Sequence, residues 1–360
     1  MREARLILED GSVFCGRTFG YDGDATGEVV FNTAMTGYPE SLTDPSYAGQ
    51  ILTLTYPLVG NYGVPSQEFA ADGLPVFMES NRIHVKGLVV ADYSEQYSHW
   101  NAKESLAEWL KREQISAITG VDTRRLTKKL RENGVMMGKI IVGGDRQHPV
   151  DTEEYGSVNW VEQVSCKEVI TYNQGASKHV VLVDCGVKAN IIRCLIRRGV
   201  EVVRVPWDYD FNCLDFDGLF LANGPGDPGR CEATVRHIRT FLSSGKVRPL
   251  MGICLGNQLL ARAAGASTYK LKYGHRSHNQ PVRQLGTNRC FITSQNHGYA
   301  VDDSTLPDDW QPLFVNMNDG SNEGICHQHY PWLSAQFHPE ACSGPTDTEW
   351  LFDEFVKMLG

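Results

Sequence analysis

The chain has 360 residues and a formal net charge of −9, which is long enough for two or three domains and argues against binding to nucleic acid or to an anionic membrane surface. No apolar run approaches the ~20 residues of a membrane-spanning helix, and the N-terminus has no apolar signal region. The ten cysteines show no paired spacing, so we expect a cytoplasmic protein with reduced thiols.

The N-terminal part of the chain predicts short strands separated by turns, together with two helices. Strand-like apolar runs lie at 29–31, 50–56 and 84–91, and helical spacing of apolar residues lies at 101–113 and 122–133. The second helix is expected to begin after Asp122 and to end before Gly134. We therefore predict a mixed β/α domain over residues 1–145.

Residues 146–178 are polar and are predicted to be a linker that packs on one domain. Beyond them, predicted strands alternate with predicted helices. The strands lie at 180–184, 201–205 and 218–222, and the helices at 191–198, 231–243 and 348–359. This alternation predicts a second α/β domain over 179–360, with a doubly wound, mostly parallel sheet.

One cysteine lies where an apolar strand turns directly into a helix. The run is Gly252-Ile253-Cys254-Leu255-Gly256, followed by a helical stretch that ends at Gly265. Glycines flank a nucleophile in this way because the tight turn leaves no room for neighbouring β-carbons. The N-terminus of the helix favours a thiolate. The spacing therefore makes Cys254 a candidate nucleophile, although most cysteines are small buried hydrophobes.

The candidate base is His338, in the run Gln336-Phe337-His338-Pro339-Glu340. In an extended chain, residues two apart point to the same side, so Glu340 can orient the imidazole. A surface turn or half of a metal site would also fit this tripeptide. A further turn, Gly224-Pro225-Gly226-Asp227-Pro228, follows the apolar strand at 218–222 and offers backbone N–H groups for an oxyanion. Together the three segments indicate acyl transfer to a thiolate.

These motifs resemble those of the class I (triad-type) glutamine amidotransferases. The N-terminal part is similar to the small, glutamine-hydrolysing subunit of carbamoyl phosphate synthetase, and the resemblance is weakest at 143–178. The matching N-terminal segments are 28–33, 35–40, 42–47, 54–57, 60–63 and 120–124. The resemblance implies a flavodoxin-like amidotransferase domain and an N-terminal domain of the swivelling β/β/α-like type.

The resemblance also implies roles for individual residues. Cys254 would attack the side-chain amide of glutamine, with His338 as base and then acid, and Glu340 holding His338. Backbone N–H groups of Gly226 and Leu255 would form the oxyanion hole. The positions that match those holding glutamine in the family are Ser46, Gly224, Gly226, Leu255, Gln258, Asn296, Gly298 and Tyr299. Because Ser46 lies in the N-terminal part, the glutamine site is expected to involve both domains.

The sequence contains no P-loop or other nucleotide-binding fingerprint. We therefore expect no cofactor and no metal in this chain, and a partner that receives the ammonia. The resemblance implies that this partner is the large synthetase subunit, which uses ATP, Mg and bicarbonate, in a heterodimer or a higher oligomer serving arginine and pyrimidine biosynthesis. The segment 274–281 is expected to be a polar loop, either a contact or signalling element or a solvated loop.

Several alternatives remain open. The chain could serve another synthetase, act as a stand-alone cysteine amidase on γ-glutamyl substrates, or be a non-enzymatic regulatory subunit. The N-terminal domain argues against the first, and the intact set of candidate catalytic residues argues against the last. His297 is a second candidate base, but it lacks a carboxylate two residues on. His327 and His329 are a possible metal pair without a third ligand.

Overall fold

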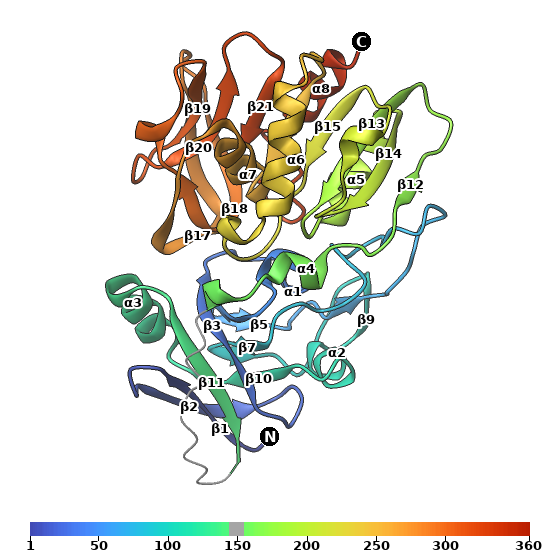
Figure 1. The fold of residues 1–360 in the computed structure, drawn as a ribbon. Helices are drawn as coiled ribbons and strands as arrows, with labels where there is room; N and C mark the ends of the chain where they lie inside the picture. The colour runs from blue at the N-terminus through green and yellow to red at the C-terminus, as the bar shows by residue number, and fades with distance from the viewer. Residues whose placement is uncertain (144–154) are drawn as a thin grey trace. The chain divides into compact units, whose positions relative to one another are not determined.

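The structure is a computed structural model that describes residues 1–143 and 155–360. The chain forms two compact units, Met1–Val158 and Asn159–Gly360, and each is described here by itself (Figure 1). The predicted linker at 146–178 falls partly on residues 144–154, which lie outside the described residues. Its later part contains helix α4 (Trp160–Val164) and strand β12 (Ile170–Tyr172), which belong to the second unit.

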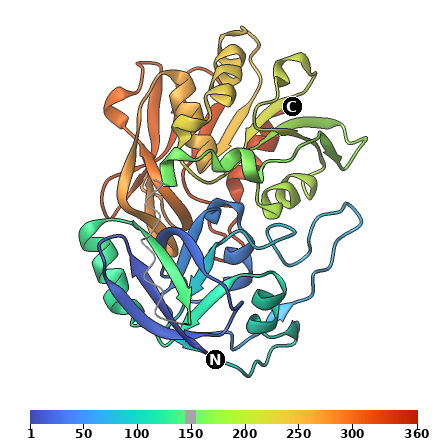
Figure 2. The same ribbon diagram turned by 60° about the horizontal axis from the view of Figure 1, so that its bottom comes forward.

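The first unit is built on a closed seven-stranded barrel, drawn in blue and green in Figure 1 and Figure 2. Its strands, in spatial order, are β1 (Glu3–Leu8), β11 (Met136–Val142), β3 (Ala25–Asn32), β4 (Gln50–Leu54), β7 (Gly87–Val89), β10 (Ser116–Thr119) and β2 (Val13–Thr18), and β2 pairs with β1 to close it. Alternate residues of β1, Ala4, Leu6 and Leu8, are buried inside, as a closed barrel requires. The expected mixed β/α domain is thus confirmed. The sequence did not predict that its strands close into a barrel.

Helices and short strands cover this barrel. They are α1 (Tyr38–Thr43), α2 (Leu106–Arg112), α3 (Thr123–Asn133), β5 (Leu58–Val59), β6 (Val64–Pro65), β8 (Asp92–Tyr93) and β9 (Ala102–Glu104). The helix predicted at 122–133 is confirmed, since the Asp122 side chain accepts the Arg125 N–H at 2.8 Å and Gly134 follows its last turn with φ +96°. The helix predicted at 101–113 begins later, because Ser105 and Glu108 form a capping box that fixes the first turn of α2.

The second unit contains a ten-stranded sheet in the order β12-β14-β13-β15-β16-β21-β20-β19-β17-β18 (Figure 1). Its parallel part consists of β14 (Val200–Pro206), β13 (Lys178–Asp184), β15 (Gly218–Leu221), β16 (Leu250–Ile253) and β21 (Trp332–Ala335). Numbered along the chain, these strands have the order 2-1-3-4-5, which is that of flavodoxin-like folds. The predicted doubly wound α/β fold is therefore confirmed.

Helices pack on both faces of this parallel part. On one face, α6 (Glu232–Ser243) and α7 (Leu255–Ala264) share a core with Leu219 and Leu221 of β15. On the other face, Phe220 contacts Phe352 and Phe355 of α8 (Trp350–Met358), with ring centroids 5.8 and 5.4 Å apart. Because successive residues of β15 are apolar on both sides, the strand is buried between two helical layers. Helix α5 (Ala189–Ile196) connects β13 to β14.

The remainder of the sheet is antiparallel and was not predicted. At one edge β12 pairs antiparallel with β14, and at the other lie β20 (Asn322–His327), β19 (Trp310–Asn316), β17 (Thr268–Gln284) and β18 (Cys290–Val301). The prediction of a polar loop at 274–281 is therefore wrong. These residues belong to β17, where His275, Arg276 and Ser277 are buried. Polar side chains in succession gave no sign of a buried strand.

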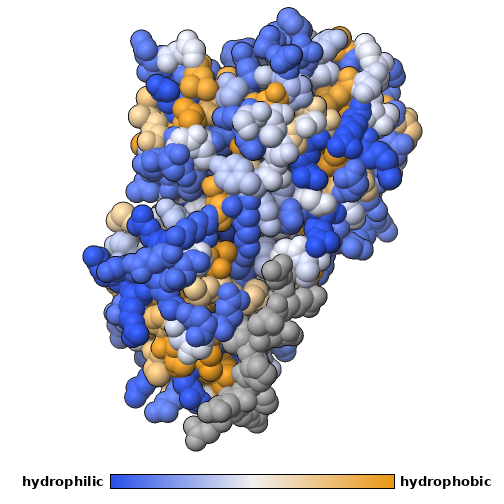
Figure 3. Space-filling model, turned by 60° about the vertical axis from the view of Figure 1, so that its left-hand side comes forward, coloured by the Kyte–Doolittle hydropathy of each residue, from blue (hydrophilic) through white to orange (hydrophobic). Residues whose placement is uncertain are grey.

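No helix among residues 1–143 and 155–360 is long and apolar enough to cross a membrane. On the face drawn in Figure 3, hydrophilic residues predominate and hydrophobic ones form small scattered patches. Such a mixed surface is ordinary for a folded domain in contact with water.

Candidate active site

Cys254 occupies a sharp turn between β16 and α7. Its backbone has φ +54° and ψ −104°, a strained conformation that persists only when the surroundings hold it. A β-carbon added at Gly256 would lie 2.2 Å from the Leu221 carbonyl oxygen, and one at Gly252 would lie 2.7 Å from the Gly256 carbonyl. Both positions therefore require glycine, as the predicted turn implies. The turn places the Cys254 side chain at the N-terminus of α7, where it is 2% exposed.

His338 and Glu340 follow β21, the strand next to β16. The His338 backbone N–H donates to the Ser294 backbone oxygen at 2.9 Å, which ties this segment to β18. His338 Nδ1 lies 2.7 Å from Glu340 Oε1, and both side chains are buried. His338 Nε2 has no hydrogen bond of ordinary geometry among the described residues. The carboxylate thus fixes one ring nitrogen and leaves the other available for proton transfer.

Charges around the imidazole determine its protonation. Burial by itself lowers the pKa of His338, but the Glu340 carboxylate and the nearby Cys254 sulfur together raise that pKa to about 10. Burial raises the pKa of Glu340, but Lys188 and His338 lower it to about 2. The arrangement therefore favours an imidazolium held between the Glu340 carboxylate and the Cys254 sulfur.

Lys188 and Asn190 complete this group, and the sequence did not single them out. Lys188 Nζ lies 3.2 Å from Glu340 Oε1 and donates to the Ala341 oxygen at 2.7 Å. Asn190 Nδ2 donates to the Glu340 backbone oxygen at 2.5 Å. Both residues follow β13, whose last residue, Asp184, accepts the Gly186 N–H at 2.8 Å and so shapes the turn. Their place after a parallel strand, at the ligand-binding edge of the sheet, was the available signal.

The turn after β15 carries the glycines that were predicted to bind glutamine. Gly226 has φ +86°, which favours glycine. A β-carbon at Gly224 would lie 2.1 Å from the Cys185 carbonyl oxygen, so the backbone of this turn packs directly against that of the segment after β13. Trp160 of α4 lies against Gly226, since a β-carbon there would be 3.3 Å from the indole Cδ1.

The predicted glutamine-binding residues of α7 and β18 lie beside the cysteine. Cys254 Sγ is 3.7 Å from the Asn296 backbone oxygen. Gln258 Nε2 donates to the Tyr299 backbone oxygen at 2.9 Å and to Gln336 Oε1 at 3.1 Å. These contacts hold the segment from Asn296 through Gly298 to Tyr299 against the first turns of α7.

Ser46 belongs to the first unit, so its role in glutamine binding stays a prediction. It lies in a short 3-10 turn after α1, is 6% exposed, and its backbone N–H donates to Asp44 Oδ1 at 2.9 Å.

The alternative base, His297, is already occupied. Its Nδ1 lies 2.8 Å from the Tyr299 backbone oxygen and its Nε2 lies 3.1 Å from Gln295 Oε1. Burial, with the nearby charge of His275, holds its pKa well below the ordinary value. Both ring nitrogens of His297 are therefore occupied, and His338 stays the predicted base.

The histidines considered for metal binding have other contacts. His327 packs on Trp332 at 5.0 Å between ring centroids, and its Nδ1 accepts the His329 N–H at 3.0 Å. In the part of the chain that the structure describes, the group close enough to share an ion is instead His275, His297 and Glu323. Each member also has a partner outside the group: His275 Nε2 lies 2.9 Å from Asp319 Oδ2, Glu323 Oε1 accepts Asn316 Nδ2 at 2.7 Å, and His297 has the contacts given above.

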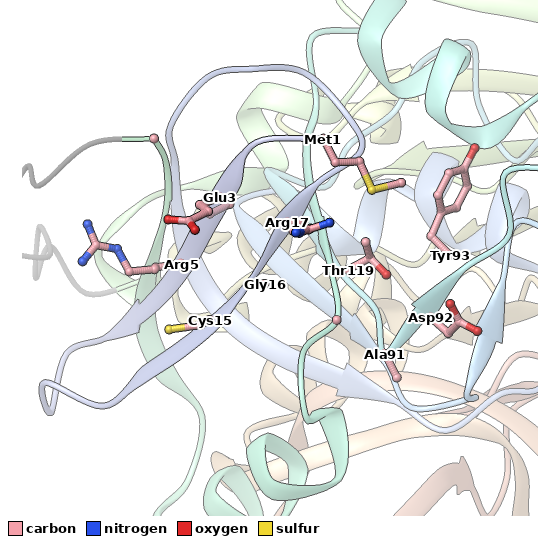
Figure 4. A pocket seen from close by; sticks show the side chains of 13 residues that line it. Met1, Glu3, Arg5, Cys15, Gly16, Arg17, Ala91, Asp92, Tyr93 and Thr119 are labelled. Carbon is pink, nitrogen blue, oxygen red and sulfur yellow. The ribbon is translucent and has the colours of Figure 1, made fainter.

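The first unit has a cavity of about 830 Å³ whose lining includes none of these residues (Figure 4). Glu3, Arg5, Arg17 and Asp92 line it, together with the backbone of β1 and β2. Gly143 also lines it. Among the described residues that line it, the cavity carries both charge signs and no nucleophile paired with a base.

Comparison with known proteins gives two family matches. Residues 6–140 match the family described as carbamoyl-phosphate synthase small chain, CPSase domain, and residues 181–358 match glutamine amidotransferase class-I. A carbamoyl phosphate synthase arginine-specific small chain from Neosartorya fischeri is 51% identical over 99% of this chain and 80% of its own length.

The multifunctional protein CAD of Squalus acanthias is 51% identical over 98% of this chain, which spans only 16% of that protein. This chain likewise spans 21% of the multifunctional protein pyr-3 of Neurospora crassa. A solved structure, that of a glutamine amidotransferase from Thermotoga maritima, has a TM-score of 0.39 and 19% identity, covering 50% of this chain and 84% of its own. The family matches and the near-complete alignment with small chains show that this chain belongs to the carbamoyl-phosphate synthase small-chain family and carries a class I glutamine amidotransferase domain.

Proposed function

We propose that this chain is the glutaminase of a carbamoyl phosphate synthase, hydrolysing L-glutamine and supplying the ammonia to a large subunit. The observation that carries the proposal is the strained, buried Cys254 at the N-terminus of α7 beside the His338–Glu340 pair, which is bonded at 2.7 Å. A thiolate with an imidazolium beside it is the arrangement that attacks an amide carbon. Family membership supports glutamine as the amide.

In the first step, Cys254 Sγ would bond to the amide carbon of the glutamine side chain. The resulting oxyanion would accept hydrogen bonds from the backbone N–H groups of Gly226 and Leu255, as in an oxyanion hole. His338 would donate its proton to the amine, which leaves as ammonia, and a γ-glutamyl thioester would remain. His338 would then take a proton from water as the water oxygen bonds to the thioester carbon. The carbon–sulfur bond would break, which releases glutamate and restores the thiolate and the imidazolium.

Glu340 and Lys188 would act on this chemistry through His338. The carboxylate fixes the tautomer of the ring, and the ammonium 3.2 Å from it keeps the carboxylate ionised inside the unit. Ser46, Gly224, Gln258, Asn296, Gly298 and Tyr299 would hold the rest of the glutamine molecule, as the resemblance implies.

A large synthetase subunit would be the partner, in a heterodimer or a larger assembly. ATP, Mg and bicarbonate would bind that subunit, and this chain would need no cofactor of its own. Small chains specific for arginine and multifunctional proteins such as CAD are both among the relatives, so the carbamoyl phosphate could enter either arginine or pyrimidine synthesis. We propose a cytoplasmic location, because the ten cysteines show no paired spacing.

The test is ammonia release from glutamine by the purified chain, with and without a large subunit supplied with ATP and bicarbonate. Slow hydrolysis alone that rises strongly with the large subunit, with carbamoyl phosphate as product, would support the proposal. Fast hydrolysis that is indifferent to the large subunit would indicate an independent amidase. No hydrolysis in either case would reject a glutaminase role.

A further inference from the structure

Arg276 is a buried cation with no anionic partner among the described residues. It lies in β17 and is 6% exposed. Its one hydrogen bond in that part of the chain joins Nη1 to the Tyr273 backbone oxygen at 2.8 Å, and Nε is buried without a partner. Arginine is almost never buried this far unless it is paired, because an uncompensated buried charge is strongly destabilising. The guanidinium therefore indicates that an anionic ligand completes its surroundings.

Two glycines make room for this guanidinium. Gly274 has φ +71°, and a β-carbon there would lie 2.6 Å from Arg276 Nη1. A β-carbon at Gly298 would lie 3.3 Å from Nη2. The charged group thus lies between the backbones of β17 and β18, and its contact on β18 is Gly298, one of the positions predicted to bind glutamine.

The register of β17 and β18 places Arg276 near the nucleophile. Arg276 is paired with Asn296 in the β17–β18 register, and Asn296 is the residue whose backbone oxygen lies 3.7 Å from Cys254 Sγ. Gly298, two residues further along β18, is displaced by about 7 Å. In glutamine, four bonds of ~1.5 Å separate the amide carbon from the α-carboxylate carbon, or about 5 Å in an extended chain. An amide carbon bonded to Cys254 would therefore leave its α-carboxylate within reach of Arg276.

We propose that Arg276 binds the α-carboxylate of glutamine and makes the site specific for an amide that carries this group. The inference rests on the proposed glutaminase function. The guanidinium presents parallel N–H donors that match a carboxylate. An amide without the carboxylate would leave the charge buried and unpaired, and sites built in this way reject such analogues strongly.

The test compares L-glutamine with 4-aminobutanamide, which is glutamine without its α-carboxylate. Ammonia release from both is measured for the full chain, with the large subunit where this is needed for turnover. Arg276→Met should lower kcat/KM for glutamine about 10- to 100-fold, the value of a charge-assisted hydrogen bond. It should leave kcat/KM for 4-aminobutanamide within about twofold, since that substrate never used the charge. Arg276→Lys should retain part of the preference for glutamine over 4-aminobutanamide.

Arg283→Met is the matched control, because Arg283 lies in the same strand with its side chain exposed. It should leave kcat/KM unchanged for both substrates. Calorimetry on the Cys254→Ala variant gives a readout that needs no turnover: adding Arg276→Met or Arg276→Lys should weaken glutamine binding and leave 4-aminobutanamide unaffected. An equal loss for both compounds would show a merely structural role, and an unchanged affinity for glutamine would also overturn the proposal. Failure of the wild-type chain to hydrolyse glutamine, while these binding differences persist, would reject the proposed function without touching the role of Arg276.

Discussion

The ion pair between Lys188 and Glu340 gives a sharp prediction about stability. The two atoms lie 3.2 Å apart, and their side chains are 6% and 0% exposed. Lys188→Met keeps the length of the side chain but leaves the buried Glu340 carboxylate with the His338 imidazolium alone to offset its charge, and it also removes the hydrogen bond to the Ala341 oxygen. Removing one member of a buried pair typically destabilises a protein by about 3–5 kcal/mol. In a unit of roughly 200 residues this corresponds to a fall in Tm of about 6–20 °C.

Lys357→Met is the matched control. Lys357 Nζ lies 2.7 Å from Glu354 Oε1, but these side chains are 70% and 49% exposed. Water screens such a pair, so this substitution should leave stability nearly unchanged although the distance is shorter. Urea unfolding and calorimetry of the full chain measure both variants. A loss below about 1 kcal/mol for Lys188→Met would refute the reasoning, given what a broken buried pair costs. So would a loss no larger than that of the control.

The remaining predictions concern the turn, the catalytic group and pH. Cys254→Ser should abolish glutamine-dependent carbamoyl phosphate synthesis in the complex but leave synthesis from added ammonia, and retained glutamine use would mean that another nucleophile acts. His338→Asn should lower kcat by about 10²- to 10⁴-fold, and Glu340→Gln by less, because the carboxylate only orients the ring; equal losses would contradict that order. The pKa of Glu340 falls from an ordinary 4.5 to about 2 in the folded chain. The free energy of unfolding of wild type should therefore exceed that of Glu340→Gln fully above pH 4.5, and this difference should disappear as the pH falls to about 2. A difference in urea unfolding that does not depend on pH would contradict this prediction. Gly256→Ala should destabilise the protein by ~3 kcal/mol or more, because its β-carbon would lie 2.2 Å from a backbone oxygen. Gly245 has φ +71° but open space around it, so Gly245→Ala should cost only about 1–2 kcal/mol. Thermal unfolding compares the two variants, and similar losses would refute the steric argument.

The parts of the site that follow from local geometry were predictable from the sequence. The elbow at Cys254 needs glycines two residues on either side, and that spacing is visible without any structure. The His338–Glu340 pair depends on residues two apart after a strand, which is also local information. The inner parallel strands β15 and β16 are apolar and buried throughout, and the strands alternate with helices, so a doubly wound parallel sheet could be predicted from the sequence.

The antiparallel half of the sheet shows why other parts were missed. Strand β17 contains His275, Arg276 and Ser277 in succession, and such a run normally indicates an exposed loop. In the folded chain these residues are buried because their partners come from distant segments: Asp319 lies 2.9 Å from His275, and Asn296 is paired with Arg276. Polarity alone predicts exposure, and only the long-range partners reverse that expectation.

Lys188 and Arg276 are two buried cations that differ in whether the chain supplies an anion to balance them. Both are nearly inaccessible, and the sequence gives no hint that either is buried. Lys188 meets the carboxylate of Glu340 inside the chain, so its charge is balanced before any ligand arrives. Within the described residues, Arg276 donates only to a backbone oxygen. Since a buried charge must be balanced by something, the first cation stabilises the folded unit and the catalytic pair, whereas the second retains its binding capacity for a substrate. The difference between them lies in whether the chain itself supplies the anion, and this is why substitution of Lys188 should be detected in unfolding and substitution of Arg276 in the choice of substrate.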